Sequence, residues 1–243
     1  MPNGKRPGAH RTGRAWLRSR DAGRDAPAFE KFVCNADTYQ QMMTEQKHAF
    51  FNQIASSWDS MQRGPQIESG VRNFVQCAYL SGAKSILDVG CGTGILVPFL
   101  LDNYPRTRPI IELDFAEEML RRNRAKFRSR RLVRLQGDAT DLPLPDESID
   151  LILCFNAAPH LGQGESAFRD MFRVLAPGGV IAVGHLMSSA ELNRFHANLH
   201  GPIAQDHLPP AKQMGTVFAN LGGKDVMTQE QSGWYFVRAN KPA

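Results

Sequence analysis

The segment ILDVGCGTG at residues 86–94 combines a short apolar run, an acid and three glycines in a form suited to binding a small ligand. Gly90, Gly92 and Gly94 have no side chain, so the backbone there can approach a ligand closely at the start of a following helix. Asp88 ends the apolar run, where a carboxylate can hold the cationic amino group of an amino acid or brace the turn. A carboxylate is unsuited to a pyrophosphate, and the spacing is GxGxG rather than GxGxxG. The motif therefore disfavours a dinucleotide.

Two more acids follow apolar runs further along the chain. Asp114 lies 20 residues beyond Gly94, a position where an acid can accept hydrogen bonds from both hydroxyls of a ribose. Phe115 can lie on the face of an adenine. In Gly137-Asp138-Ala139, the carboxylate can accept from the adenine amino group while a backbone N–H donates to the ring. These three sites offer groups for an amino acid, a ribose and a base.

Short apolar runs alternate with helical patterns from residue 83 onward. This alternation predicts an α/β, Rossmann-like fold with a seven-stranded, mostly parallel sheet, helices on both faces and a C-terminal antiparallel hairpin. We expect the first five strands near residues 85–90, 109–114, 132–136, 149–155 and 179–185. We expect helices near residues 94–103, 116–128, 164–175, 188–199 and 211–221. The hairpin strands are expected at 225–229 and 234–239.

The N-terminal part of the chain has a different character. Residues 1–31 carry eight Lys or Arg against three acids, which accounts for the whole formal net charge of +5. Because this part is rich in Gly, Pro and Arg and has no apolar periodicity, residues 1–37 are predicted to be a disordered basic leader. Apolar residues at three- and four-residue steps predict a helix over 38–60, and a second helix is expected over 67–80.

Composition excludes several classes of protein. A hydrophobic content of 42% and a charged content of 22% are ordinary for a soluble globular chain. The longest apolar runs fall well short of the roughly 20 residues that cross a bilayer, so we expect no membrane span. The four cysteines have no CxxC or CxxH spacing, which disfavours a zinc site and a disulfide framework and fits a reducing cytoplasm.

Taken together, four motifs resemble the class I S-adenosylmethionine (SAM)-dependent methyltransferases, and more narrowly the ubiquinone/menaquinone-methyltransferase type of domain. The resemblance covers about residues 46–185. It rests on ILDVGCGTG at 86–94, the acid of IIELDFAEEML at 114, GDATDLPLPDESID at 137–150 and FRDMFRVLAPGG at 168–179.

This resemblance implies that SAM is the cofactor of a domain spanning 83–243, and that the helices of 38–82 form an N-terminal lid. The implied cofactor-binding residues lie at the ends of the first four strands. They are Asp88, Gly90, Cys91, Gly92, Thr93, Gly94, Asp114, Phe115, Asp138, Ala139, Phe155 and Asn156.

Three departures from the family pattern narrow the inference. Glu112 replaces the glycine usual two residues before the ribose acid, and Ala116 replaces a common serine that would cap the next helix. The segment Asn156-Ala157-Ala158-Pro159-His160 is not the Asn/Asp-Pro-Pro-aromatic signature of enzymes that methylate exocyclic base or glutamine nitrogens. That class is disfavoured.

Histidines and acids gather after the fourth and fifth strands. His160 and His185 are the candidate catalytic residues, because both follow strand ends where the methyl acceptor meets the sulfonium, and His160 is a candidate general base. Alternatively, the His160 imidazole packs within its loop and has a structural role only. His196 and His200 are one turn apart on an expected helix, and with His185 they are candidate metal ligands. Pocket lining or plain surface is the favoured interpretation, so we expect no metal. Glu191 and Asp206-His207 belong to the same polar cluster.

The sequence predicts transfer of a methyl group to a small-molecule acceptor, quinone-like or otherwise lipophilic. Two alternatives stay open. One is an RNA methyltransferase that uses the basic leader and the segment RRNRAKFRSRRLVR at 121–134, which is otherwise a solvated helix face. The other is a SAM-binding protein without catalysis.

Overall fold

The computed structural model describes residues 36–62, 64–162 and 165–243. The first helix, α1, spans Ala36–Met61 and so begins two residues inside the predicted leader. The rest of that leader, residues 1–35, lies outside the described residues.

A seven-stranded sheet forms the centre of the fold, in the order β3-β2-β1-β4-β5-β7-β6. The parallel strands are β1 (Ile86–Val89), β2 (Ile110–Asp114), β3 (Leu132–Gln136), β4 (Ile149–Phe155) and β5 (Leu175–His185). Strands β6 (Lys224–Gln231) and β7 (Trp234–Asn240) form the C-terminal hairpin, and β7 pairs antiparallel with β5. The strand order reverses between β1 and β4, which is where open α/β sheets bind ligands.

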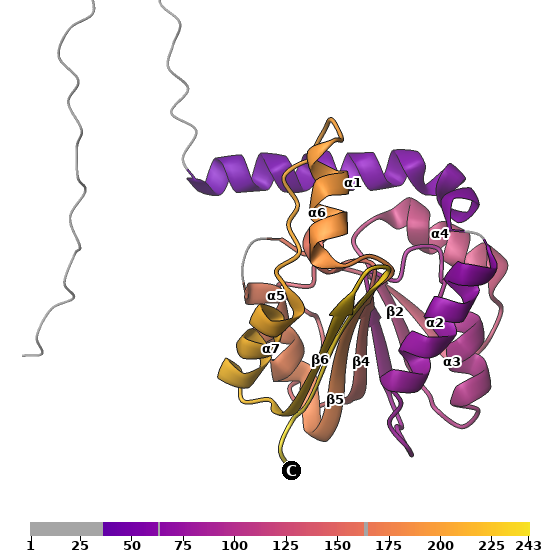
Figure 1. Cartoon of the computed structure of the whole chain (residues 1–243). Coiled ribbons are helices and arrows are strands. Elements are labelled where there is room, and N and C mark those ends of the chain that lie inside the picture. The colour runs from indigo at the N-terminus through magenta and orange to yellow at the C-terminus, as the bar shows by residue number, and fades with distance from the viewer. Residues whose placement is uncertain (1–35, 63, 163–164) are drawn as a thin grey trace, which may run out of the picture. The chain divides into compact units, whose positions relative to one another are not determined.

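Helices cover both faces of the sheet (Figure 1). On one face lie α2 (Pro65–Cys77), α3 (Val97–Asn103) and α4 (Glu117–Lys126), and on the other lie α5 (Ser166–Val174) and α7 (Ala211–Asn220). Helix α6 (Ser189–Ala197) follows β5, and the one-turn helix η1 (Ala158–His160) follows β4. Among the described helices, none is both long enough and apolar enough to cross a membrane.

Side chains that point alternately to the two faces of the sheet build two apolar layers. In β1, Leu87 and Val89 face the layer of α5 and α7, whereas Ile86 faces the layer of α2 and α3. All three side chains are fully buried. Since successive strand residues point to opposite faces, Asp88 shares the face of Ile86 and lies in an apolar layer.

Several predicted boundaries are wrong by two to four residues. Helix α2 ends at Cys77 rather than 80, and helix α3 begins at Val97 rather than 94. Strand β5 begins at Leu175 rather than 179, because Leu175 pairs with Ile149 of β4 and thereby joins the sheet. Helix α6 ends at Ala197, and residues 198–200 are no longer helical. The one-turn spacing predicted for His196 and His200 is therefore absent.

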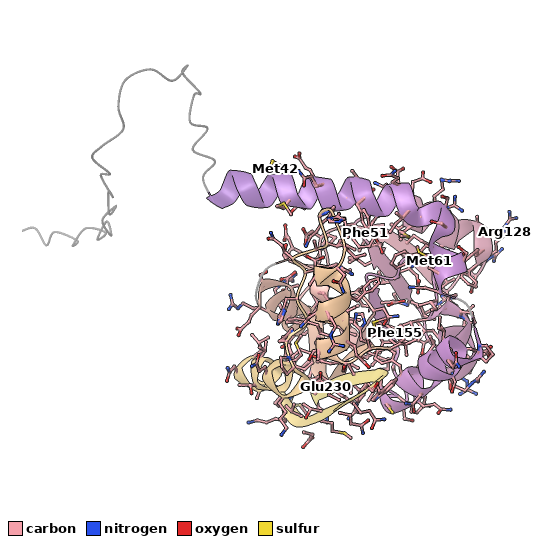
Figure 2. All side chains as sticks on the ribbon, turned by 45° about the horizontal axis from the view of Figure 1, so that its top comes forward. Met42, Phe51, Met61, Arg128, Phe155 and Glu230 are labelled. Atoms are coloured by element: carbon pink, nitrogen blue, oxygen red, sulfur yellow. The ribbon has the colours of Figure 1, made fainter. Side chains whose placement is uncertain are left out.

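Helix α1 packs beside α4 and supplies a cap that α4 lacks. Ala116, at the N-cap of α4, has no side-chain hydrogen bond. In its place the Glu118 backbone N–H donates to Asn52 Oδ1 of α1 over 2.9 Å. Phe51 lies on the side of α1 that faces the domain (Figure 2) and packs against Ala116 and Met119. Helix α1 is thus joined to α4 by a polar cap and an apolar contact.

Replacement of this cap should loosen α1. We expect Asn52→Ala to lower the free energy of unfolding by about 0.5–2 kcal/mol, the usual cost of losing a side-chain cap, as measured by urea denaturation. Asn198→Ala is a matched control, because Asn198 is exposed and makes no side-chain hydrogen bond with the described residues. Equal stability of the two variants would contradict the capping role.

Candidate functional site

The glycine turn leaves β1 in a conformation that only glycine adopts without strain. Gly90, Gly92 and Gly94 have φ values of 69°, 53° and 91°. The N–H groups of Gly90 and Cys91 both donate to the Leu113 carbonyl, at 2.8 and 3.0 Å. A Cβ atom on Gly90 would stand 2.4 Å from the Ala157 Cβ atom. The turn is therefore held tightly between β2 and the residues that follow β4.

Asp114, the predicted ribose acid, ends β2 beside this turn. Its Oδ2 accepts from the Gly92 N–H and its Oδ1 accepts from the Ala116 N–H, both at 2.8 Å. Each oxygen keeps a lone pair for a further donor. Burial is the largest effect on this group and raises its pKa to about 6, although the two N–H donors act in the opposite direction.

Two more carboxylates are buried next to Asp114. Strand register places Asp88 directly beside Glu112, and Glu112 beside Arg134 of β3. Asp88 is 1% exposed and its Oδ2 has no hydrogen-bond partner. Burial and the charges of Glu112 and Asp114 raise the pKa of Asp88 well above its usual range. The site is therefore an acidic cluster whose burial Arg134, beside Glu112, offsets only in part.

Glu112, the departure from the family glycine, is 0% exposed. The Asn123 side-chain amide donates to its Oε2 over 2.8 Å, and Arg134 donates to Asn123 Oδ1 over 2.9 Å. Burial raises the pKa of Glu112 to about 7, against the opposing effects of Asn123 and Arg134. Glu112 thus lies beneath the turn, away from the cavities described below.

The residues predicted to bind the adenine lie farther from the glycine turn. The Asp138 side chain is exposed, and its Oδ1 accepts from the backbone N–H and the hydroxyl of Thr140, both at 2.8 Å. Phe115 lies edge-on to Phe51 of α1, with ring centroids 5.6 Å apart. Ala139 is buried and belongs to the apolar core. Asp138 keeps its second carboxylate oxygen for a ligand.

Asn156 takes up a left-handed conformation, with φ of 55°, which Asn tolerates better than most residues. Its backbone N–H donates to Gly184 O, and its side chain accepts from the Leu186 N–H. Phe155 before it is buried. The chain after β4 is thereby fixed opposite the glycine turn.

Helix α1 closes over the turn. The Thr93 hydroxyl donates to Asp59 Oδ1 over 2.5 Å, and Lys126 donates to the same oxygen over 2.9 Å. Trp58 lies over the turn, since a Cβ atom on Gly92 would be 3.4 Å from its indole nitrogen. Nothing in the sequence pattern around Thr93 indicated the contact with Asp59.

Three cavities adjoin one another beneath α1. The first, about 60 Å³, is lined by the glycine turn, Asp114, Phe155 and Asn156. The second, also about 60 Å³, shares His160 and Phe115 with the first. The third is about 390 Å³ and shares Met43 and Lys47 with the second. Its remaining walls are mostly apolar and include Pro159, Phe168, Met214 and Val217.

His160 lies where the first two cavities meet. Its Nδ1 is 2.6 Å from Asp206 Oδ2, and Lys47 of α1 pairs with Asp206 Oδ1. Its ring packs edge-on against Phe51, with centroids 5.1 Å apart. The sequence predicted a polar cluster containing Asp206, but it missed Lys47, which lies 159 residues away in the chain.

Of the other predicted histidines, His196 packs beside His160, with ring centroids 5.2 Å apart, but His185 and His200 do not join this arrangement. His185 is buried and its Nε2 has no partner, and burial lowers its pKa to about 3. It lines none of the three cavities. The His196 ring nitrogen Nδ1 is 2.9 Å from the Asp206 carbonyl, whereas His200 is exposed. Among the described residues, no group of three metal-ligating side chains is arranged to hold a metal ion.

Half of the cations in the basic segment at 121–134 have partners inside the domain. Arg121 pairs with Glu118, and Lys126 with Asp59. Arg131 donates to the carbonyls of Leu101 and Tyr104, and Arg134 donates to Asn123 and to the Phe127 carbonyl. The segment therefore serves in part to hold the domain together.

The residues of the turn fit SAM. SAM carries an ammonium and a sulfonium, and the buried carboxylate of Asp114 lines the first cavity. The unpaired oxygen of Asp88 lies behind the turn, outside the three cavities. The turn itself is shaped by its internal hydrogen bonds and by glycines that leave no room for a side chain, as at Gly90. A dinucleotide would bring phosphates into this acidic cluster, which opposes its binding.

Comparisons with known proteins agree with this assignment. Residues 87–183 match the family model described as a methyltransferase domain. A demethylmenaquinone methyltransferase of Symbiobacterium thermophilum is 32% identical over 155 residues, which cover 59% of this chain and 62% of that protein. A ubiquinone/menaquinone biosynthesis C-methyltransferase of Salmonella arizonae is 28% identical over 158 residues, which cover 60% of this chain and 62% of that protein. The chain thus matches about three-fifths of the length of these relatives.

Solved structures share the fold at lower identity. In a complex between the Haloferax volcanii Trm112 methyltransferase activator and a methyltransferase, the matched chain has a TM-score of 0.68 and 18% identity. The match covers 79% of this chain and 98% of that chain. This likeness confirms the predicted Rossmann-like fold.

Removal of the ribose acid should weaken SAM binding. We expect Asp114→Ala to reduce the affinity by about 1–3 kcal/mol through loss of charge-assisted hydrogen bonds, as measured by calorimetry. In the wild type, affinity should also fall as the pH drops below about 6, because Asp114 then takes up a proton that SAM binding must displace. Asp102→Ala, which removes an exposed acid of α3, should leave the affinity unchanged. Unchanged affinity in Asp114→Ala would refute the assignment.

Neutralising Glu112 should stabilise the domain at alkaline pH. Its pKa is raised to about 7 in the folded chain, so its contribution to stability is present at low pH and is lost as the pH rises from about 4.5 through 7. We expect Glu112→Gln to be about 1–3 kcal/mol more stable than the wild type at pH 8, with a smaller difference at pH 5, by urea denaturation. The exposed Glu117, changed to Gln, is the control. A less stable Glu112→Gln at pH 8 would show that the carboxylate is stabilising.

Proposed function

We propose that this chain, which carries a class I SAM-dependent methyltransferase domain of the ubiquinone/menaquinone-methyltransferase type, methylates a small apolar acceptor with a quinone-like ring. The observation that carries the proposal is the 390 Å³ cavity with apolar walls, which adjoins the cavities of the glycine turn. The two relatives are named for menaquinone and ubiquinone methylation, which favours a ring of this kind.

The residues at the ends of β1, β2 and β3 would divide the cofactor between them. Asp88 and the turn from Gly90 to Gly94 hold the amino-acid part, Asp114 the ribose, and Asp138 with Phe115 the adenine. Phe155 and Asn156 border the transferred group. Bound there, SAM supplies an activated methyl group on a sulfonium.

The protein then has little covalent chemistry to perform. Its residues align the acceptor with the methyl carbon and exclude water, which together supply most of the acceleration in such displacements. Helix α1 serves both purposes in this proposal, because Trp58 covers the glycine turn and Met43 with Lys47 lines the acceptor cavity. On this account α1 is the lid of the site, whereas α2, the second helix of the predicted lid 38–82, covers the sheet and lines none of the three cavities.

RNA is less well supported as an acceptor. The apolar walls of the large cavity do not suit a phosphate backbone, and four cations of segment 121–134 have partners within the domain. A purely SAM-binding role leaves the same cavity without an occupant. Free thiols at Cys77, Cys91 and Cys154 fit a reducing compartment, so we place the reaction in the cytoplasm.

The proposal is tested by following labelled SAM. We expect the full chain to transfer the labelled methyl group to reduced naphthoquinone or benzoquinone derivatives well above the rate without acceptor, and not to RNA oligonucleotides. Gly92→Val is the control, because a β-branched residue at φ of 53° is strained and its side chain would occupy the cofactor turn. Transfer to RNA alone, or SAM binding without transfer to any acceptor, would each decide for the corresponding alternative.

A further inference from the structure

We propose that His160, oriented by Asp206 and Lys47, is the base that removes the proton from a hydroxyl group of the methyl acceptor. The inference rests on the proposed function and makes it more specific. It limits the acceptor to a ring with an ionisable hydroxyl group, such as a quinol or another phenol.

The contact with Asp206 fixes the tautomer of His160. Asp206 Oδ2 is 2.6 Å from Nδ1 and, as a carboxylate, can only accept, so Nδ1 carries the hydrogen. The lone pair is then on Nε2, which has no hydrogen-bond partner among the described residues. His160 is 12% exposed and lines the two small cavities. Its free nitrogen is therefore available to a bound molecule.

Lys47 holds the other oxygen of Asp206. The Lys47 and Asp206 side chains are 15% and 6% exposed, so the pair is largely shielded from water. The carboxylate is thus fixed by one partner at each oxygen, and it cannot rotate away from His160 without breaking the ion pair. Asp206 and Lys47 are positioning residues, because both act through the His160 ring.

Other titratable groups near His160 are poorly placed to be the base. His185 stays neutral, since its pKa is lowered to about 3, and it lines none of the three cavities. His196, with its centroid 5.2 Å from that of His160, is bound to the Asp206 carbonyl. Asp114 faces His160 from β2, and His48 faces Asp114 from α1. These groups set the electrostatic surroundings of His160, together with Asp206 and Lys47.

The large cavity indicates what the base acts on. Most of its lining is apolar, and its polar lining residues are Lys47, Glu165, Gln205, Asp206 and His207. Lys47 also lines the second cavity. His160 lines the second cavity rather than the large one, so the hydroxyl of a ring held in the large cavity would have to enter the second cavity to meet its Nε2. A thiol or an amine depends less on such a base, because a thiol ionises readily and a neutral amine already has a lone pair.

The step balances without a further reagent. The acceptor O–H bond breaks and its proton goes to His160 Nε2, while the electron pair stays on oxygen and is shared with the ring carbon next to it. That oxygen or carbon bonds to the methyl carbon as the carbon–sulfur bond breaks and its pair goes to sulfur. After attack by carbon, the ring hydrogen leaves as a second proton. His160 finally releases its proton to solvent.

Nuclear magnetic resonance tests the relay without any turnover. In the ¹⁵N-labelled full chain, we expect the neutral His160 ring to carry hydrogen on Nδ1 and to lose this preference in Asp206→Asn. His200→Gln, which changes an exposed histidine, identifies signals unrelated to the site. A wild-type ring with hydrogen on Nε2 would overturn the proposal.

The pH–rate profile with 1,4-dihydroxynaphthalene, kept reduced by dithiothreitol, tests the chemistry. We expect His160→Ala to keep its SAM affinity, to lose about 10²–10⁴ in kcat and to lose the acidic limb of the profile. Asp206→Asn should move that limb to lower pH and Lys47→Met to higher pH, each by about one unit, because they remove opposite charges. Lys126→Met, which breaks another ion pair of α1, should leave the position of the limb unchanged.

Two results separate this inference from the proposed function. If the wild type methylates only acceptors without a hydroxyl group, such as thiols or amines, the base is refuted and the methyltransferase stands. If SAM does not bind, or no acceptor of any kind is methylated, the proposed function itself fails. Shifts of the acidic limb in the same direction for Asp206→Asn and Lys47→Met would show that the variants act through misfolding. That result would also overturn the relay, and Asp206→Glu should restore the wild-type profile if the relay is correct.

Discussion

Three carboxylates share the buried space beneath the glycine turn, and their removal from water is the constraint on which the site depends. Strand register places Asp88 beside Glu112, and Asp114 ends the same strand as Glu112. Burial raises the pKa of all three groups, and the charges of neighbouring acids raise it further for Asp88 and Glu112. This unfavourable burial is offset only in part within the domain, by Arg134, Asn123 and the backbone N–H groups that donate to Asp114. A cationic ligand relieves the remainder, so the same arrangement that reduces the stability of the empty domain favours SAM over a phosphate-bearing cofactor.

Helix α1 connects this acidic end of the site with the end that holds the large cavity, the proposed acceptor site. Asn52 caps α4, Asp59 accepts from Thr93, and Lys47 pairs with Asp206. These contacts are spaced along one helix, so a displacement of α1 would affect the glycine turn and the surroundings of His160 together. Access to the small cavities of the turn is governed by the same helix, because Phe51 and Trp58 line one of them.

The sequence predicted what local patterns determine and missed what distant contacts determine. Strands β2, β3 and β4 lie within one residue of their expected bounds, because buried apolar runs bounded by turn residues identify such strands. The start of β5 was wrong because Leu175 joins the sheet only through pairing with Ile149. The metal hypothesis rested on a helix that continues to residue 199, and α6 ends at Ala197. Lys47 could not have been found, since its partner lies 159 residues away and no local pattern links them. Ala116 was read correctly as a missing cap, but the substitute from Asn52 is again a distant contact.

In the proposed reaction, the two ends of the site change charge in concert. Transfer of the methyl group removes the positive charge of the sulfonium near the acids of β1 and β2, while the proton taken from the acceptor adds a positive charge at His160. Asp206, which faces His160 at 2.6 Å, is placed to stabilise that charge, and Asp114 also interacts favourably with a charged His160. Positive charge is therefore lost at the sulfonium and gained at His160, and both positions lie close to acidic residues. Once His160 returns its proton to solvent, only the ammonium of the product would offset the burial of these carboxylates. This loss of one positive charge would weaken the hold on the product relative to SAM, which would favour exchange of the two on the same set of residues.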